Sequence, residues 1–276
     1  MSREIRVEID GVELRSRLDP PGHGGPVVVL LHGFTGSAAA MEPLAVPLRR
    51  THRVLSVDLV GHGGSAVPDD TSAYSTEAVA RHLVGLFEAL ELGDVVLVGY
   101  SMGGRIALTL ACSRPDLVAG LVTIGATAGL TDPLARAERR ASDAALADDI
   151  ERDGLEAFVD RWMALPLFAT QASLGPQALA RIRDQKLLNS PEGLARSLRG
   201  GGTGSMAPLH DRLARLDTPA LFLAGGLDAK YRAIAHELAQ LTPAGEARVI
   251  DRAGHAAHLE RPVDVARSVA TFVASL

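Results

Sequence analysis

Hydrophobic patterns typical of β-strands and of helices alternate along most of the chain. Residues 5–18 place apolar side chains at every second position on both sides of Asp10-Gly11, which predicts a β-hairpin. Further along, short apolar runs lack this alternation, as is typical of strands that are buried on both faces of a parallel sheet. Such runs occupy residues 27–31, 53–57, 94–98, 117–124, 219–224 and 248–251.

Segments with helical periodicity separate these runs. They cover residues 38–50, 76–90, 104–111 and 262–276, and Thr76 is expected to cap the second of them. Strands that alternate with helices in this way predict an α/β fold, with a mostly parallel sheet flanked by helices.

The alternation stops between residues 129 and 213. Only helical patterns occur there, at residues 133–149, 154–165, 175–188 and 191–198. A helical insertion between two strands of an α/β sheet predicts a cap over the carboxyl ends of the strands, where ligands bind. We therefore expect a core formed by residues 1–128 and 214–276, and an inserted helical cap formed by residues 129–213.

The segment Gly99-Tyr100-Ser101-Met102-Gly103 lies between an apolar run and a helical segment. A serine on a sharp turn from strand to helix is the nucleophile elbow of the α/β-hydrolase fold. The glycines allow strand and helix to approach while Ser101 projects its hydroxyl. The alternative is a glycine-rich turn that only packs, but the strand and helix on either side favour the catalytic interpretation.

Two further residues follow predicted strands in the order that this fold requires. Asp228 and His255 come after Ser101 in the sequence Ser, acid, His. A serine hydroxyl needs an imidazole to take its proton and a carboxylate to orient that imidazole. His258 is an alternative candidate for the base. Asp58 precedes Ser101 in the sequence, whereas the acid of this fold follows the serine, so we expect a structural role for Asp58.

An oxyanion hole is predicted from two backbone amides. The glycine-rich loop at residues 32–37 follows the first parallel strand, and in this fold such a loop supplies one donor, here the N–H of Phe34. The N–H of Met102 is the second donor. The alternative is an ordinary loop, and His32 is expected to be structural rather than catalytic.

Composition narrows the range of partners. The 276 residues carry a net charge of −5 and contain one cysteine. The charge argues against nucleic acid, and a single cysteine cannot form an intrachain disulfide. No segment resembles a signal peptide or a membrane span, so we expect a soluble, cytoplasmic protein, either a monomer or a small homo-oligomer. The predicted cap is rich in arginine, although for any single arginine a solvated helix face is the simpler interpretation.

Several segments together resemble one family closely. They are residues 32–36, 99–105, 138–143, 162–168, 194–204, 228–231 and 253–258. The chain is similar over nearly its whole length to 2-succinyl-6-hydroxy-2,4-cyclohexadiene-1-carboxylate synthase, an α/β-hydrolase-fold lyase of menaquinone biosynthesis. The triad and the loop at residues 32–36 are general to the superfamily, whereas the Tyr-Ser-Met-Gly-Gly-Arg segment and the tryptophan segment of the cap are more specific.

The resemblance implies an activity and a set of binding residues. The activity is elimination of pyruvate from 2-succinyl-5-enolpyruvyl-6-hydroxy-3-cyclohexene-1-carboxylate, a small-molecule tricarboxylate, without a metal or other cofactor. Tyr100, Arg105, Arg139 and Trp162 match family positions that are implicated in substrate binding. Lys186 stands where some relatives have an arginine, and we do not count it as a site residue.

The mechanism expected from the resemblance uses Ser101 as a base. His255 and Asp228 would activate Ser101 to remove the proton next to the succinyl ketone, while the amides of Phe34 and Met102 hold the enolate oxygen. One alternative is a carboxylesterase or carbon–carbon bond hydrolase that acts through an acyl-enzyme. Another is a ligand-binding receptor in which the triad is vestigial.

Overall fold

The computed structural model describes residues 2–22 and 24–276 and contains an eight-stranded sheet in the order β1-β2-β4-β3-β5-β6-β7-β8. The first two strands form the predicted antiparallel hairpin, and β3 to β8 run parallel to one another. The strands are β1 Arg3–Ile9, β2 Val12–Leu18, β3 Val27–Leu31, β4 Val54–Val57, β5 Val95–Tyr100, β6 Val118–Ile124, β7 Ala220–Gly225 and β8 Gly245–Ile250.

The central strands are buried on both faces, as their continuous apolar sequences require. Every residue of β3, β4 and β7 is buried. Strand β8 lies at the edge of the sheet and is only partly buried, so its first half carries no continuous apolar run. For this reason the sequence pattern placed its start three residues too late, at residue 248.

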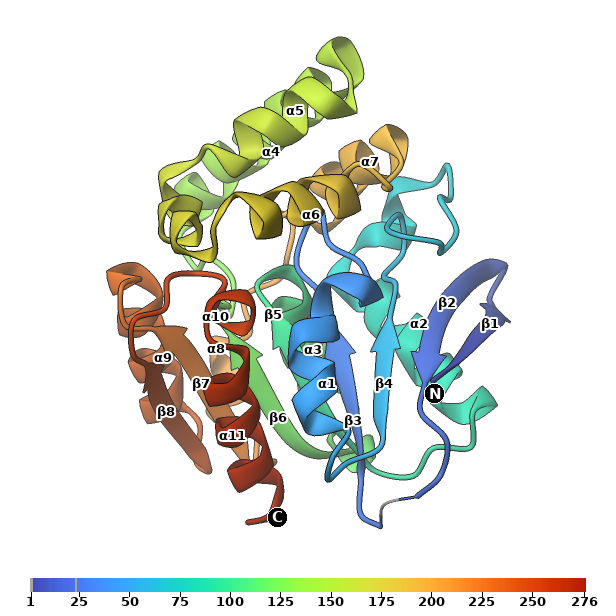
Figure 1. The fold of residues 1–276 in the computed structure, drawn as a ribbon, viewed down its shortest axis with the longest axis vertical. Coiled ribbons are helices and arrows are strands. Elements are labelled where there is room, and N and C mark those ends of the chain that lie inside the picture. Colours follow the sequence, from blue (N-terminus) through green and yellow to red (C-terminus); the bar gives the residue numbers. More distant parts are fainter. Residues whose placement is uncertain (1, 23) are drawn as a thin grey trace.

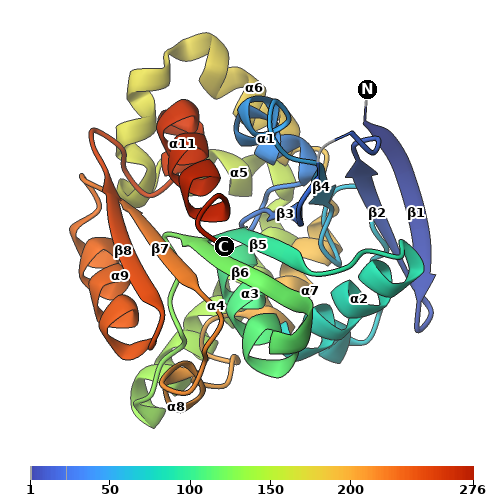
Figure 2. The ribbon, with the colours of Figure 1, turned by 90° about the horizontal axis from the view of Figure 1, so that it is seen from below.

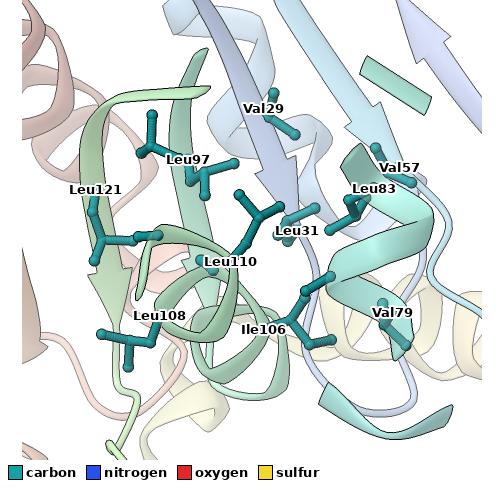
Figure 3. Packing of buried hydrophobic residues seen from close by; sticks show 14 of the residues in the cluster. Val29, Leu31, Val57, Val79, Leu83, Leu97, Ile106, Leu108, Leu110 and Leu121 are labelled. Carbon is teal, nitrogen blue, oxygen red and sulfur yellow. The ribbon is translucent and has the colours of Figure 1, made fainter. Parts of the chain in front are cut away.

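Helices cover both faces of the sheet (Figures 1 and 2). Helices α1 Glu42–Leu48 and α11 Pro262–Val273 pack on one face, and α2 Thr76–Ala89, α3 Met102–Ser113 and α9 Ala229–Leu241 pack on the other. Figure 3 shows Ile106 and Leu110 of α3 beside Leu31 of β3 in the larger of the two core clusters. This packing fixes the position of α3, which begins directly after the predicted catalytic serine, Ser101.

Two predicted helix starts differ from the structure. The cap of α2 is Ser75, whose Oγ accepts a hydrogen bond from the N–H of Ala78 at 3.2 Å, while Thr76 is the first helical residue and is buried. The segment predicted as one helix at residues 38–50 begins with a 3₁₀ turn, η1 Ala38–Met41, and continues as α1. Pro43 occupies the first turn of α1, where its missing N–H costs no helical hydrogen bond.

The inserted segment between β6 and β7 is helical, and it lies above the sheet in Figure 1. It has its own small core, in which Ile150, Phe158 and Leu194 are fully or almost fully buried. Its elements are α4 Pro133–Asp153, α5 Leu155–Met163, η4 Pro166–Leu174, α6 Pro176–Lys186, α7 Pro191–Gly201 and α8 His210–Leu213. We keep residues 129–213 as the proposed limits of the cap. None of the helices in the described chain is both long and apolar enough to cross a membrane.

The turn from β5 into α3 leaves no room for side chains at its glycines. A Cβ on Gly99 would lie 2.3 Å from the carbonyl oxygen of Gly103, and a Cβ on Gly103 would lie 2.3 Å from that of Leu31. Ser101 between them has φ of 48°, a left-handed conformation that non-glycine residues rarely adopt. The two glycines therefore permit the close approach that holds Ser101 in this turn.

We expect Gly103→Ala to destabilise the fold. The new methyl group would meet backbone atoms of β3, and such overpacking costs about 1–3 kcal/mol of unfolding free energy, more than the helix propensity of alanine returns. Urea denaturation measures the change. Gly93→Ala is the matched control, because nothing lies within 4 Å of its Cβ position, and it should change stability by less than about 0.5 kcal/mol. A Gly103→Ala protein as stable as the wild type would contradict this account of the turn.

Candidate active site

Three side chains from distant parts of the sequence meet at the carboxyl ends of β5, β7 and β8. The Nε2 of His255 lies 3.3 Å from the Oγ of Ser101, and its Nδ1 lies 2.9 Å from Oδ2 of Asp228. The second oxygen of Asp228 accepts a hydrogen bond from the N–H of Tyr231 at 3.2 Å. This is the geometry of a serine activated by an imidazole that a carboxylate orients.

The carboxyl group of Asp228 is stabilised as the anion. Burial raises its pKa, but the hydrogen bonds from His255 and from the N–H of Tyr231 outweigh burial and hold the pKa below its usual value. Asp228 is therefore ionised at neutral pH. The Nδ1–H of His255 donates to it, which leaves Nε2 to accept a proton from Ser101.

The alternative base His258 and the other candidate acid Asp58 interact with residues outside the triad. His258 is fully buried against the ring of Tyr100, with 4.1 Å between the ring centroids, and burial lowers its pKa to about 3. The oxygens of Asp58 accept hydrogen bonds from the N–H groups of Ala38 and Gly64 and from Arg15. Asp58 therefore joins two loops of the core, which agrees with the structural role expected for it.

The two predicted oxyanion donors come from different segments, and both residues line one cavity with Ser101. Met102 is the first residue of α3, and Phe34 lies in the loop after β3. Neither backbone N–H donates to an acceptor within the described chain. His32 fixes the start of that loop, because its Nε2 accepts from the N–H of Leu59 at 3.0 Å while Nδ1 bonds the carbonyl oxygen of Gly33 at 2.8 Å.

A cavity of about 220 Å³ lies between Ser101 and the inserted helices. Of the charged side chains that line it, Arg105, Arg139 and Lys230 are cationic and Asp143 is anionic. Aromatic rings form one wall, with ring centroids 5.3 Å apart for Phe34 and Trp162. A cavity with this charge and this apolar wall suits a small molecule that carries carboxylates on a hydrocarbon ring.

The two predicted substrate-binding arginines reach the cavity from different elements. Arg105 of α3 is buried and donates from Nη1 to the carbonyl oxygen of Gly201 at 2.7 Å. Burial, together with the charge of Arg139, lowers the pKa of Arg105 to about 10, so it stays charged at neutral pH. Arg139 of α4 donates from Nε to Asp143 at 2.9 Å. Nη2 of Arg105 and both Nη atoms of Arg139 make no hydrogen bond within the described chain and are suited to charge-assisted contact with an anion.

The other two predicted binding residues also line the cavity. The indole N–H of Trp162 is buried without a hydrogen-bond partner in the described chain, as is expected of a donor that awaits a ligand. Burial raises the pKa of Tyr100 well above its usual value, so its hydroxyl stays protonated. Lys186 instead donates to Oγ1 of Thr35 at 2.7 Å in the loop after β3.

Three cavity residues lay in segments that carried the family resemblance but were given no role. The ring centroid of Tyr231 lies 4.4 Å from that of His255. Lys230 and Asp143 are the other charged residues that line the cavity. Other arginines of the inserted helices make ion pairs on the surface, such as Arg152 with Asp149. In the part of the chain that the structure describes, no cluster of three or more His, Cys, Asp or Glu residues could hold a metal ion.

The fold and the Ser–His–Asp arrangement define a class, the α/β hydrolases. A family model described as the alpha/beta hydrolase fold matches residues 26–262. A Bacillus subtilis (strain 168) protein assigned to the 2-succinyl-6-hydroxy-2,4-cyclohexadiene-1-carboxylate synthases is 39% identical over 267 residues, 97% of each chain. A Salmonella paratyphi C synthase of the same name is 37% identical over 255 residues, 92% of this chain and 96% of the relative. The chain therefore belongs to the 2-succinyl-6-hydroxy-2,4-cyclohexadiene-1-carboxylate synthase family.

Solved structures agree with this assignment. The structure of MenH from S. aureus has a TM-score of 0.90 and 30% identity, and the match covers 94% of this chain and 98% of that one. An enol-lactonase from Burkholderia xenovorans LB400 has a TM-score of 0.83 and 26% identity, covering 98% and 100% of the two chains. The predicted fold class and family are thus confirmed.

We expect Asp228→Asn to slow the reaction of Ser101 with a fluorophosphonate probe by about 10³- to 10⁴-fold, since an amide favours the wrong tautomer of His255. The rate of covalent labelling, followed by mass spectrometry, measures this. Asp251→Asn is the matched control, because Asp251 is exposed and lies outside the triad. Equal labelling rates for Asp228→Asn and the wild type would show that Asp228 does not orient the imidazole.

The Asp228→Asn variant also tests the lowered pKa of Asp228. A carboxyl group whose pKa is lower in the folded chain than in the unfolded chain stabilises the fold above about pH 3.9, and this contribution is lost as the pH falls through the folded-state value. The difference in unfolding free energy between the wild type and Asp228→Asn should therefore shrink as the pH falls below about 4. A difference that grows in that range would contradict the lowered pKa.

Proposed function

We propose that this protein eliminates pyruvate from 2-succinyl-5-enolpyruvyl-6-hydroxy-3-cyclohexene-1-carboxylate to give 2-succinyl-6-hydroxy-2,4-cyclohexadiene-1-carboxylate. The observation that carries the proposal is the position of the Ser101–His255–Asp228 triad beside a cavity lined by Arg105 and Arg139. The substrate has three carboxylates, and the family relatives carry the name of this synthase.

The first step is removal of a proton from the ring carbon next to the succinyl ketone. Ser101 takes this proton while His255 takes the proton of the serine hydroxyl, and Asp228 stabilises the imidazolium that forms. The carbonyl oxygen becomes an enolate oxygen, which the N–H groups of Phe34 and Met102 hold. Ser101 acts as a base throughout and forms no bond to carbon.

The second step expels the leaving group. The enolate re-forms the ketone, a double bond forms to the neighbouring ring carbon, and the ring alkene shifts to displace the enolpyruvyl oxygen. The imidazolium of His255 returns its proton, and the released enolpyruvate becomes pyruvate. Atoms and charges balance without a metal or other cofactor, and the basic cavity holds the carboxylates in place.

The roles proposed for the binding residues follow from their chemistry. Arg105 and Arg139 pair with substrate carboxylates, and Trp162 and Tyr100 donate hydrogen bonds from the aromatic wall. A protein that carries out this chemistry works on a small molecule, and its single cysteine suits the reducing cytoplasm. We keep the cytoplasm, and a monomer or small homo-oligomer, as parts of this proposal.

A hydrolase that acts through an acyl-enzyme is the second candidate. It uses the same triad and the same two amide donors, and the similarity to the Burkholderia xenovorans LB400 enol-lactonase favours it over a binding protein. The basic cavity favours the elimination instead, because ester hydrolysis in general needs no cluster of cations beside the serine.

We expect the purified protein to release pyruvate from the succinyl-enolpyruvyl substrate, and Ser101→Ala to reduce the rate to the spontaneous background. A coupled pyruvate assay measures both rates. The physical reason is that alanine lacks the oxygen that accepts the proton. Release by the wild type no faster than the background would refute the proposed function, and a Ser101→Ala protein with full activity would refute the role of the serine.

We expect Arg139→Ala to raise KM by about 10- to 100-fold, as the loss of a charge-assisted hydrogen bond of about 1.5–3 kcal/mol implies. Arg152→Ala is the matched control on the same helix, because Arg152 pairs with Asp149 and Asp153 on the surface. It should leave kcat and KM unchanged. Similar kinetic constants for the two variants would mean that Arg139 does not contact the substrate.

A further inference from the structure

Asn189 lies in the cap, between α6 and α7, and is buried. Its amide makes three hydrogen bonds. Oδ1 accepts from the N–H of Gly63 at 2.9 Å, and Nδ2 donates to the carbonyl oxygens of Thr35 and Lys186, each at 3.0 Å. One cap side chain thus joins the loop after β3, the loop after β4 and the end of helix α6.

Thr35 is the residue that follows the predicted oxyanion donor Phe34. It is fully buried and has φ of 64°, a left-handed conformation that is a genuine outlier for a β-branched residue. Such a conformation persists only where its surroundings hold it. Two of the contacts that hold Thr35 come from the cap, since Nδ2 of Asn189 donates to its carbonyl oxygen and Nζ of Lys186 donates to its hydroxyl.

The core also holds this loop, at its start and across the turn that has Phe34 and Thr35 at its centre. His32 bonds the carbonyl oxygen of Gly33, the N–H of Gly36 donates to the same oxygen at 2.9 Å, and Asp58 accepts from the N–H of Ala38. Within the described chain, the donor that reaches the carbonyl oxygen of Thr35 is Asn189. The carbonyl oxygen of Gly33, in the same peptide as the Phe34 N–H, is therefore held by the core, and the carbonyl oxygen of Thr35, at the other end of the turn, is held by the cap.

We propose that Asn189 is a positioning residue that makes the oxyanion hole depend on the docked cap. Its amide holds the Thr35 end of the turn that presents the Phe34 N–H, and thereby completes the alignment of this donor. When the cap leaves the core, this hydrogen bond is lost and the loop relaxes. Proton removal from the substrate is then stabilised only when the cap covers the cavity, an inference that rests on the oxyanion role proposed above.

The bond to Gly63 gives the arrangement rigidity. Asp58 already ties the loops after β3 and β4 together beneath the cap, through the N–H groups of Ala38 and Gly64. Asn189 ties the same two loops from above, through Thr35 and Gly63. Two side chains that bridge the same pair of loops hold them far more firmly than either does alone, which suits a donor that must stay aligned.

The experiment compares Asn189→Asp and Asn189→Ala with the matched control Ser190→Ala. The aspartate variant keeps the size of the side chain and the acceptor for Gly63, but it removes the donor to Thr35. Ser190 caps α7 by accepting from the N–H of Gly193 at 3.1 Å and, within the described chain, makes no hydrogen bond to the oxyanion loop. The readouts are kcat and KM for pyruvate release, the rate of Ser101 labelling by a fluorophosphonate, and the melting temperature.

We expect both Asn189 variants to lower kcat and the labelling rate by about 10- to 100-fold, with KM changed less than about threefold, because a displaced donor weakens stabilisation of the oxyanion but not ground-state binding. Ser190→Ala should leave kcat and the labelling rate unchanged even if its melting temperature falls. If Asn189→Ala fails to fold, Asn189→Asp decides the question.

Three results would overturn the inference. They are an unchanged kcat and labelling rate in Asn189→Asp, an equal fall in Ser190→Ala, and a rise in KM with kcat unchanged. Absence of labelling in the wild type would overturn it too, because a complete oxyanion hole beside an activated serine must accept the probe. A wild type that is labelled but releases no pyruvate refutes the proposed function alone, since the labelling rates still test the role of Asn189.

Discussion

The pair of hydrogen bonds from Ser101 to His255 and from His255 to Asp228 is the constraint on which the rest of the structure depends. These bonds, of 3.3 and 2.9 Å, join residues that stand 154 and 27 positions apart. A parallel sheet makes this possible, because it brings the carboxyl ends of β5, β7 and β8 to one edge. The glycines of the elbow, the packing of α3 and the hydrogen bond from the Tyr231 N–H to Asp228 all preserve this alignment.

The second constraint is the charge of the cavity. Arg105 is buried and its guanidinium bonds a neutral carbonyl group, and burial lowers its pKa. Cations held in this way, next to Arg139 and Lys230, are most stable when an anionic ligand is present. Phe34 and Trp162 add aromatic surface to the lining of the same cavity. This combination of cations and aromatic rings beside the serine is what the proposed polycarboxylate substrate requires.

Much of the fold could be predicted because its signals are local. Continuous apolar runs marked β3, β5 and β7, and the elbow motif located Ser101, with Asp228 and His255 placed by chain order. The start of β8 was missed because this edge strand has no continuous apolar run. The cap of α2 was assigned to Thr76 rather than Ser75 because serine and threonine can both cap a helix, so the sequence does not distinguish them.

The contacts between cap and core could not be predicted from the sequence. Asn189 and Thr35 lie 154 residues apart, and no local pattern connects them. The left-handed conformation of Thr35 has no signal either, because threonine rarely adopts it. Their pairing requires that the inserted helices dock on the sheet, which depends on the packing of the whole molecule.

The most direct test of the account is a comparison of two substrates. One carries hydrogen and the other carries deuterium at the ring carbon next to the succinyl ketone. If Ser101 is the base that removes this proton, kcat/KM for pyruvate release must be lower for the deuterated substrate. Equal values of kcat/KM for the two substrates, with an acyl group found on Ser101 in protein quenched during turnover, would contradict the account and identify the protein as an acyl-transferring hydrolase.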